Sequence, residues 1–94
     1  MKQNDAERDA LYEAVLLLKT PDECRDFLTD LCTPAELTAL ADRLAVAKLL
    51  LQEKPYRTIS EEKGVSVTTV TRVARFLSYG TGGYRTIFKR MGLL

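Results

Sequence analysis

The amino-acid sequence predicts an all-α fold of about six helices that includes a helix-turn-helix. Helix-start signals repeat along the chain, apolar residues recur at helical spacing, and no run alternates polar and apolar residues for long enough to predict a strand. The composition, 46% hydrophobic and 29% charged over 94 residues, is that of an ordinary globular protein. We therefore expect residues 1–94 to form a single helical domain.

Two helices are predicted in the first third of the chain. The first covers about Asp5–Lys19, and its apolar residues extend beyond one face, which indicates burial on two sides. The second covers about Pro21–Leu31 and overlaps the tetrapeptide Thr20–Glu23. This tetrapeptide has a capping threonine, a proline at the first helical position and a glutamate that can reach back to the cap, so it predicts a helix start.

A longer helix is predicted at about Pro34–Glu53. The segment Thr33–Glu36 repeats the same start signal, and Lys54-Pro55 ends the helix, because a residue before proline avoids the helical region. The predicted apolar stripe of this helix consists of Leu37, Leu40, Ala41, Leu44, Ala47 and Leu51.

Three signals organise the second half of the chain. The segment Thr58–Glu61 predicts a third capping box, without the proline. The glycine-rich segment Gly80–Gly83 predicts a flexible joint, and a last short helix is expected at about Tyr84–Met91.

The segment Tyr56–Leu77 has the pattern of a helix-turn-helix, with Val67–Leu77 as its recognition helix. Ser60 is small enough for two helices to cross closely, Gly64 suits a tight turn that needs positive φ, and Ser66 can cap the second helix. The residues expected to tie both helices to the body of the protein are Ile59, Val65, Val70 and Val73.

The exposed face of the recognition helix is predicted to contact DNA. Residues near the N-terminus of such a helix reach base edges in the major groove, while nearby arginines and lysines hold phosphates. Threonines can hydrogen-bond bases or touch a thymine methyl group, and a valine can make an apolar contact. The predicted DNA-binding residues are Arg57, Lys63, Ser66, Val67, Thr68, Thr71, Arg72 and Arg75.

The distribution of charge supports double-stranded DNA as the partner. The net charge is only +1, but residues 1–42 hold four basic and ten acidic residues, a net of −6. Residues 43–94 hold ten basic and three acidic residues, a net of +7. Such asymmetry favours a second half that meets phosphate.

The chain lacks the residue patterns that several other functions require. The chain has no histidine, and its two cysteines, Cys24 and Cys32, do not form a Cys-x-x-Cys pair, so no zinc site is expected. No nucleophile–base pair or phosphate-binding loop is recognisable, so we predict neither an enzyme nor a cofactor. The sequence has no apolar run near the roughly 20 residues of a membrane helix and no signal peptide, which predicts a cytoplasmic protein without membrane contact.

The segment from Leu31 to Leu77 resembles the Trp repressor family, including its Trp-repressor-related bacterial proteins of unassigned ligand. The resemblance rests on Leu-Cys-Thr-Pro-Ala-Glu-Leu-Thr-Ala-Leu-Ala-Asp-Arg, then Lys-Leu-Leu-Leu, then Val-Thr-Thr-Val-Thr-Arg. It implies an all-helical, interlocked homodimer that binds a two-fold symmetric operator. It also implies that Arg43 and Arg72 occupy the positions of the two arginines in the family's co-repressor pocket.

Two residues near that pocket depart from the family pattern. Val73 stands where the family has a small glycine that leaves room for an indole ring, and Phe76 stands where it has a serine. Because packed interiors have few spare voids, we do not expect tryptophan as a co-repressor. Arg43 and Arg72 are instead expected to pair with acidic neighbours, or to meet an acidic ligand or phosphate.

These observations predict a homodimeric, sequence-specific transcriptional regulator that acts as a repressor. A chain this short buries a marginal core by itself, so a partner subunit would stabilise it. The alternative is a helical protein-interaction module that kept the fold and lost DNA binding, with the acidic first half as its working surface.

Overall fold

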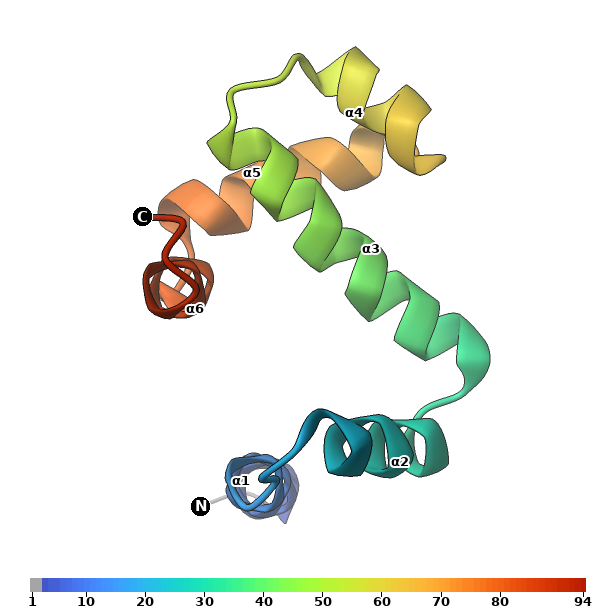
Figure 1. The fold of residues 1–94 in the computed structure, drawn as a ribbon, viewed down its shortest axis with the longest axis vertical. Coiled ribbons are helices and arrows are strands. Elements are labelled where there is room, and N and C mark those ends of the chain that lie inside the picture. Colours follow the sequence, from blue (N-terminus) through green and yellow to red (C-terminus); the bar gives the residue numbers. More distant parts are fainter. Residues whose placement is uncertain (1–2) are drawn as a thin grey trace. The chain divides into compact units, whose positions relative to one another are not determined.

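The computed structural model describes residues 3–94, which form six α-helices and no strand, so the predicted all-α class is confirmed (Figure 1). The described residues divide into two compact units, one that ends at Leu37 and one that covers Thr38–Leu94. The prediction of one domain over residues 1–94 stays a prediction. The helices are α1 Gln3–Leu16, α2 Pro21–Leu31, α3 Pro34–Leu51, α4 Tyr56–Lys63, α5 Val67–Tyr79 and α6 Gly83–Arg90.

Helix α1 ends earlier than the sequence predicted, at Leu16 instead of Lys19. The start signal of α2 explains the difference. The backbone N–H of Lys19 donates to the Glu23 carboxylate over 2.9 Å, while the N–H of Glu23 donates to the Thr20 hydroxyl over 3.1 Å. Because Glu23 of α2 accepts the N–H of Lys19, this N–H is not available for a further turn of α1.

Helix α3 begins with a reciprocal capping box. The N–H of Glu36 donates to the Thr33 hydroxyl over 3.1 Å, and the N–H of Thr33 donates to the Glu36 carboxylate over 2.9 Å. The Thr33 N–H, followed by the Thr33 hydroxyl, lowers the pKa of Glu36 below its ordinary value of 4.5. The ionised form of Glu36 is thus the one that caps the helix.

The end of α3 lies at Leu51, slightly before the predicted Glu53. Glu53 adopts a left-handed conformation with φ of 59°, and the N–H of Lys54 donates to the Leu49 carbonyl over 3.4 Å. A residue at positive φ cannot continue a right-handed helix, and Pro55 keeps Lys54 out of the helical region.

The third predicted capping box is wrong. Helix α4 begins at Tyr56 with Pro55 as its N-cap, so Thr58 lies inside the helix. The N–H of Ile59 donates to the Pro55 carbonyl over 3.1 Å, which closes a first helical turn that already contains Thr58. The preset backbone of Pro55, with φ of −60°, competes successfully with the threonine as the start of the helix.

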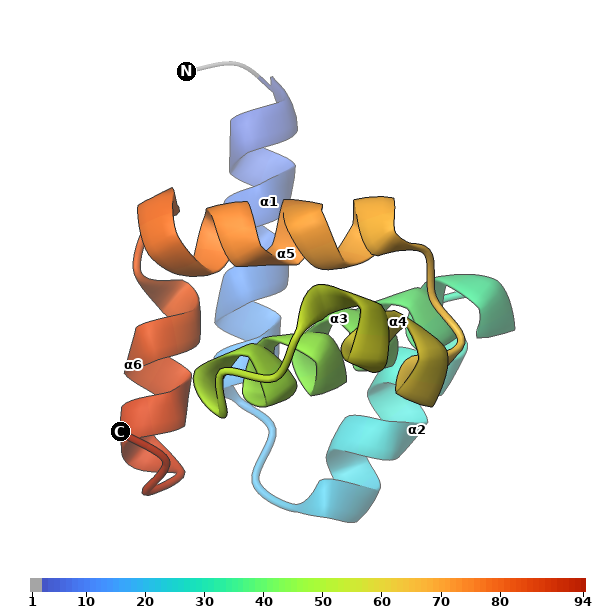
Figure 2. The same ribbon diagram turned by 90° about the horizontal axis from the view of Figure 1, so that it is seen from above.

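Helices α5 and α6 are joined by the glycine-rich segment. Helix α5 ends at Tyr79, because Gly80 takes an extended conformation, and a Cβ atom at this position would collide with the backbone oxygen of Phe76. Gly82 has φ of 88° and caps α6. Figure 2 shows α4 near the N-terminal end of α5, whereas α6 leaves from its C-terminal end.

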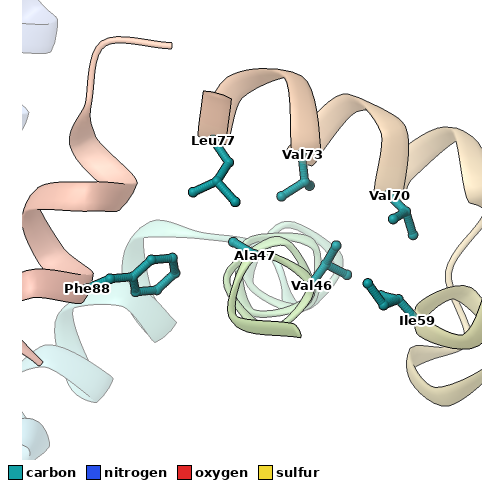
Figure 3. Packing of buried hydrophobic residues seen from close by; sticks show 7 residues of the cluster. All are labelled: Val46, Ala47, Ile59, Val70, Val73, Leu77 and Phe88. Carbon is teal, nitrogen blue, oxygen red and sulfur yellow. The ribbon is translucent and has the colours of Figure 1, made fainter. Parts of the chain in front are cut away.

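The core of the unit Thr38–Leu94 lies between α3 and the three helices that follow it. Figure 3 shows the side chains of α5 pointing toward α3, with Ile59 of α4 at one end and Phe88 of α6 at the other. The α3 stripe predicted from the sequence is only partly correct, because Val46 is fully buried while Leu40 is 47% exposed. The buried residues are Val46, Ala47, Ile59, Val70, Val73, Leu77 and Phe88.

Candidate nucleic-acid interface

A tight turn joins α4 to α5, as the sequence predicted. Gly64 has φ of 64° and ψ of 31°, the left-handed conformation that glycine adopts without steric cost. Its N–H and that of Val65 both donate to the carbonyl of Ser60, and the Ser60 hydroxyl donates back to the carbonyl of Val65. The small residue predicted for close helix crossing therefore also fastens the turn through its hydroxyl group.

Ser66 is the N-cap of α5, which also confirms the prediction. Its hydroxyl oxygen accepts the N–H of Thr69 over 3.1 Å, and it shares a second hydrogen bond of 3.1 Å with the Thr69 hydroxyl. These bonds hold the first turn of α5, whose remaining free N–H groups and positive dipole end favour a nearby phosphate.

One face of α5 is buried and the opposite face is exposed. Val70, Val73 and Leu77 enter the core at the spacing of one helix face. The side chains predicted to contact DNA lie outside this face, and each of them is exposed: Val67, Thr68, Thr71, Arg72 and Arg75. The core thus fixes the rotation of α5 about its axis and presents these five residues to solvent.

These five residues line one open groove of about 410 Å³, together with Phe76. Phe76 is 57% exposed and was not among the predicted DNA-binding residues. Its spacing gives a signal that could have found it, because Thr68, Arg72 and Phe76 recur every four residues along α5. The groove therefore combines hydroxyl groups, two guanidinium groups and one aromatic ring.

The two predicted contacts on α4, Arg57 and Lys63, are both exposed and lie in its first and last turns. Neither has an ion-pair partner among residues 3–94. The nearby carboxylate of Glu62 is engaged, because Lys54 approaches it to 3.2 Å. Helix α4 thus leaves two cations available, one near each of its ends, ahead of the turn that leads into α5.

Arg43 of α3 and Arg72 of α5 line the same two clefts. One cleft, of about 410 Å³, is also lined by Val73, Phe76 and Tyr84. The expected pairing of these arginines with acidic neighbours is wrong within one chain, because both are exposed and neither forms an ion pair among the described residues. Exposure to water removes the desolvation cost that would have demanded a partner.

Val73 fills the space that a glycine, the residue of the family pattern at this position, would leave open. Its side chain is 2% exposed and points toward α3 between Val70 and Leu77 (Figure 3). A glycine at this position would leave the volume of an isopropyl group open between α5 and α3. In this chain that volume is filled by the protein itself.

Among the described residues, no cluster of three or more histidine, cysteine or acidic residues is arranged to hold a metal ion. Within the same part of the chain, no helix is both long enough and apolar enough to cross a membrane.

Comparison with known proteins agrees with this architecture. The profile of the family described as Trp repressor protein matches residues 6–92. The uncharacterised protein YerC of Bacillus subtilis (strain 168) is 40% identical over 90 residues, which cover 96% of this chain and 86% of YerC.

Two solved structures are similar over nearly their whole length. A TrpR-like protein from Eubacterium eligens ATCC 27750 is 43% identical, with a TM-score of 0.86 over 92% of this chain and 89% of its own. The crystal structure of a candidate Trp repressor from Staphylococcus aureus is 39% identical, with a TM-score of 0.89 over 100% of this chain and 98% of its own.

Proposed function

We propose that this chain, which belongs to the Trp repressor family, is a sequence-specific DNA-binding regulator that represses transcription. The family is one of regulatory DNA-binding proteins and not of enzymes. The groove on the exposed face of α5 supports this function best, because it gathers Thr68, Thr71, Arg72 and Arg75 on a helix held by a fixed turn. We propose the cytoplasm as its location, because such a regulator works on chromosomal DNA.

The proposed regulator binds its operator as a homodimer. None of the residues 5–37 is buried within a single chain. Several apolar residues of α1 are exposed, including Leu16 at 83% and Tyr12 at 57%. A second copy would cover this apolar surface. To read half-sites one helical turn apart, the two copies of α5 in the proposed dimer would lie about 34–36 Å apart.

Within the groove, the side chains have different proposed roles. Thr68, Thr71 and Val67 lie toward the N-terminal end of α5 and read base edges, while Arg75 holds a phosphate. Arg57 and Lys63, near the two ends of α4, hold the DNA backbone. Ser66 contributes through the helix start that its hydroxyl group organises.

Selection from random double-stranded DNA tests the proposal. The purified protein is expected to enrich an inverted repeat, with affinity that falls steeply as salt rises, because released counterions drive the association. A folded dimer that enriches no inverted repeat at low salt would contradict DNA recognition. A stable protein partner under the same conditions would favour the alternative, a protein-interaction module.

Two substitutions separate base reading from phosphate binding. Thr71→Ala should alter the enriched sequence at one position of each half-site. Arg75→Ala should weaken binding to all sequences alike and lower the salt slope by about 1. Identical changes in specificity for both variants would contradict these roles.

We also propose that DNA binding does not require tryptophan. The buried Val73 joins α5 to α3 without a ligand, so α5 is already held in place. Isothermal titration of the wild-type protein with tryptophan should give no saturable heat, and DNA affinity should be the same with and without the amino acid. Tryptophan-dependent DNA binding by the wild-type protein would overturn this part of the proposal.

A further inference from the structure

Helix α4 is held in the core by a single side chain. Ile59 is the only residue of α4 that is buried, whereas α5 buries three residues. At its C-terminal end, α4 is also fastened to the turn at Gly64 through the backbone and side chain of Ser60. At its N-terminal end, the cap residue Pro55 offers no side-chain hydrogen bond. The N-terminal end of α4 therefore needs a contact of another kind to fix its orientation.

An ion pair supplies this contact. The ammonium group of Lys54, the residue before Pro55, donates to both carboxylate oxygens of Glu62, over 3.2 and 3.4 Å. Glu62 lies in the last turn of α4, so the pair spans most of the length of the helix. It joins the connection after α3 to α4, whereas the ion pair of Arg25 with Asp22 lies within α2.

The turn after α3 places the backbone of Lys54 for this contact. Glu53, with φ of 59°, is the only non-glycine residue at positive φ among residues 3–94. The next N–H, that of Lys54, donates to the carbonyl of Leu49 on α3 over 3.4 Å. A residue other than glycine persists at positive φ only where its surroundings hold it there. The end of α3 thus fixes the backbone of Lys54, and its side chain transmits this constraint to α4.

The strength of the pair suits a weakly held helix. The side chains of Lys54 and Glu62 are 37% and 41% exposed, so water weakens their attraction. An exposed pair of this kind shifts an equilibrium by about fivefold at most. Such a shift matters only for a segment with few other buried contacts, and α4, which buries Ile59 alone, is such a segment.

We propose that Lys54 is a positioning residue for DNA recognition: its pairing with Glu62 holds α4 in the orientation in which Arg57 and Lys63 meet phosphates. Lys54 acts through Glu62 and does not itself contact DNA. When α4 is correctly oriented for only a fraction of the time, the apparent DNA affinity falls in proportion to that fraction. The inference rests on the proposed function and adds how the first helix of the helix-turn-helix is held.

The direction of one effect separates positioning from simple charge. Glu62→Gln removes a negative charge, so charge alone predicts tighter binding to DNA. Positioning predicts the reverse, a dissociation constant raised by about two- to fivefold, because α4 loses the contact that orients it. Fluorescence anisotropy with the enriched operator measures the constant. At about 0.15 M salt the Debye length is about 8 Å, which screens the effects of more distant charges.

Glu61→Gln is the matched control. It changes the net charge by the same amount one residue away, and Glu61 is exposed, without an ion-pair partner among residues 3–94. This variant should bind the operator like the wild type or slightly more tightly. Tighter binding by Glu62→Gln would overturn the proposal, as would equal weakening by the two variants.

Exchange of the two charges provides a rescue. Lys54→Glu places two carboxylates together, so it should weaken operator binding more than Glu62→Gln does. Addition of Glu62→Lys re-forms the pair with the opposite polarity and should restore the wild-type affinity within about twofold. Glu62→Lys by itself should weaken binding although it adds positive charge, a result that additive charge effects cannot give. Tighter binding by this single variant would contradict the positioning role.

Hydrogen exchange tests the ion pair without DNA. In Glu62→Gln, amides around Ile59 should exchange about two- to fivefold faster than in the wild type, while those around Val70 should not change. Unchanged exchange in α4 would overturn the proposal. Faster exchange with unaltered operator affinity would also overturn it, because Lys54 would then stabilise α4 without serving recognition. A wild-type protein that enriches no DNA sequence would instead overturn the proposed function itself.

Discussion

The two units of this chain differ in what holds them together. The unit Thr38–Leu94 contains all seven buried residues of the described chain, drawn from four helices. In the other unit, which ends at Leu37, no side chain from residue 5 onward is buried, and the hydrogen bonds of two capping threonines define its helix starts. Helical form can therefore be specified locally without a core, but a unit without a core needs a partner for its apolar residues.

The largest expected effect comes from the core. Phe88 is fully buried and packs its ring against Tyr84, with ring centroids 5.8 Å apart. Phe88→Ala should lower the free energy of unfolding by about 3–5 kcal/mol, measured in urea, because it removes buried surface and leaves a cavity. Ser78→Ala, on the exposed side of α5, should change it by less than about 0.5 kcal/mol. Equal effects would contradict the assignment of the core.

Dilution should affect hydrogen exchange in the two units differently. If a second copy covers α1, amide hydrogen exchange around Val15 should accelerate by at least about tenfold when the protein is diluted into the monomeric range. Amides around Val70 should respond less, because contacts within one chain bury that residue. Hydrogen-exchange mass spectrometry at two concentrations measures both segments, and equal acceleration of both would contradict the comparison.

A smaller effect is expected at the turn between α4 and α5. Gly64→Ala should cost about 1 kcal/mol of folding free energy, because an alanine is strained at φ of 64° although no atom lies within 4 Å of the added Cβ. Gly83→Ala is the matched control, since its Cβ also meets no atom and its backbone is not left-handed. Thermal unfolding should leave that variant unchanged or slightly stabilised, because the unfolded chain loses freedom.

The smallest effect concerns the capping box of α3. Because the pKa of Glu36 is lowered in the folded protein, its contribution to stability is present above its ordinary pKa of 4.5. This contribution is lost as the pH falls through the lowered pKa. NMR titration should give a Glu36 pKa below 4.5, and Glu36→Gln should remove this part of the acid dependence. A Glu36 pKa at or above the ordinary value would contradict the capping role.

Helix caps and turns were predicted correctly from the sequence where no competing signal lies nearby. Thr20 and Thr33 cap their helices, and Gly64 and Ser66 shape the helix-turn-helix as predicted. The interpretation was wrong at Thr58, where a proline three residues earlier provides a competing start. The sequence pattern correctly indicated a helix start in this region, but it could not decide whether the helix begins after Pro55 or at Thr58.

The amino-acid sequence by itself determined the helical class, the family, the helix-turn-helix and the opposite charges of the two halves of the chain. These features depend on residues a few positions apart or on composition, so they need no knowledge of distant contacts. Only the tertiary structure decided that Val46 is buried while Leu40 is exposed, that Arg43 and Arg72 have no acidic partner within the described chain, and that Phe76 joins the groove of α5. Burial and pairing depend on which helices meet, and the packing of side chains far apart in the sequence decides that.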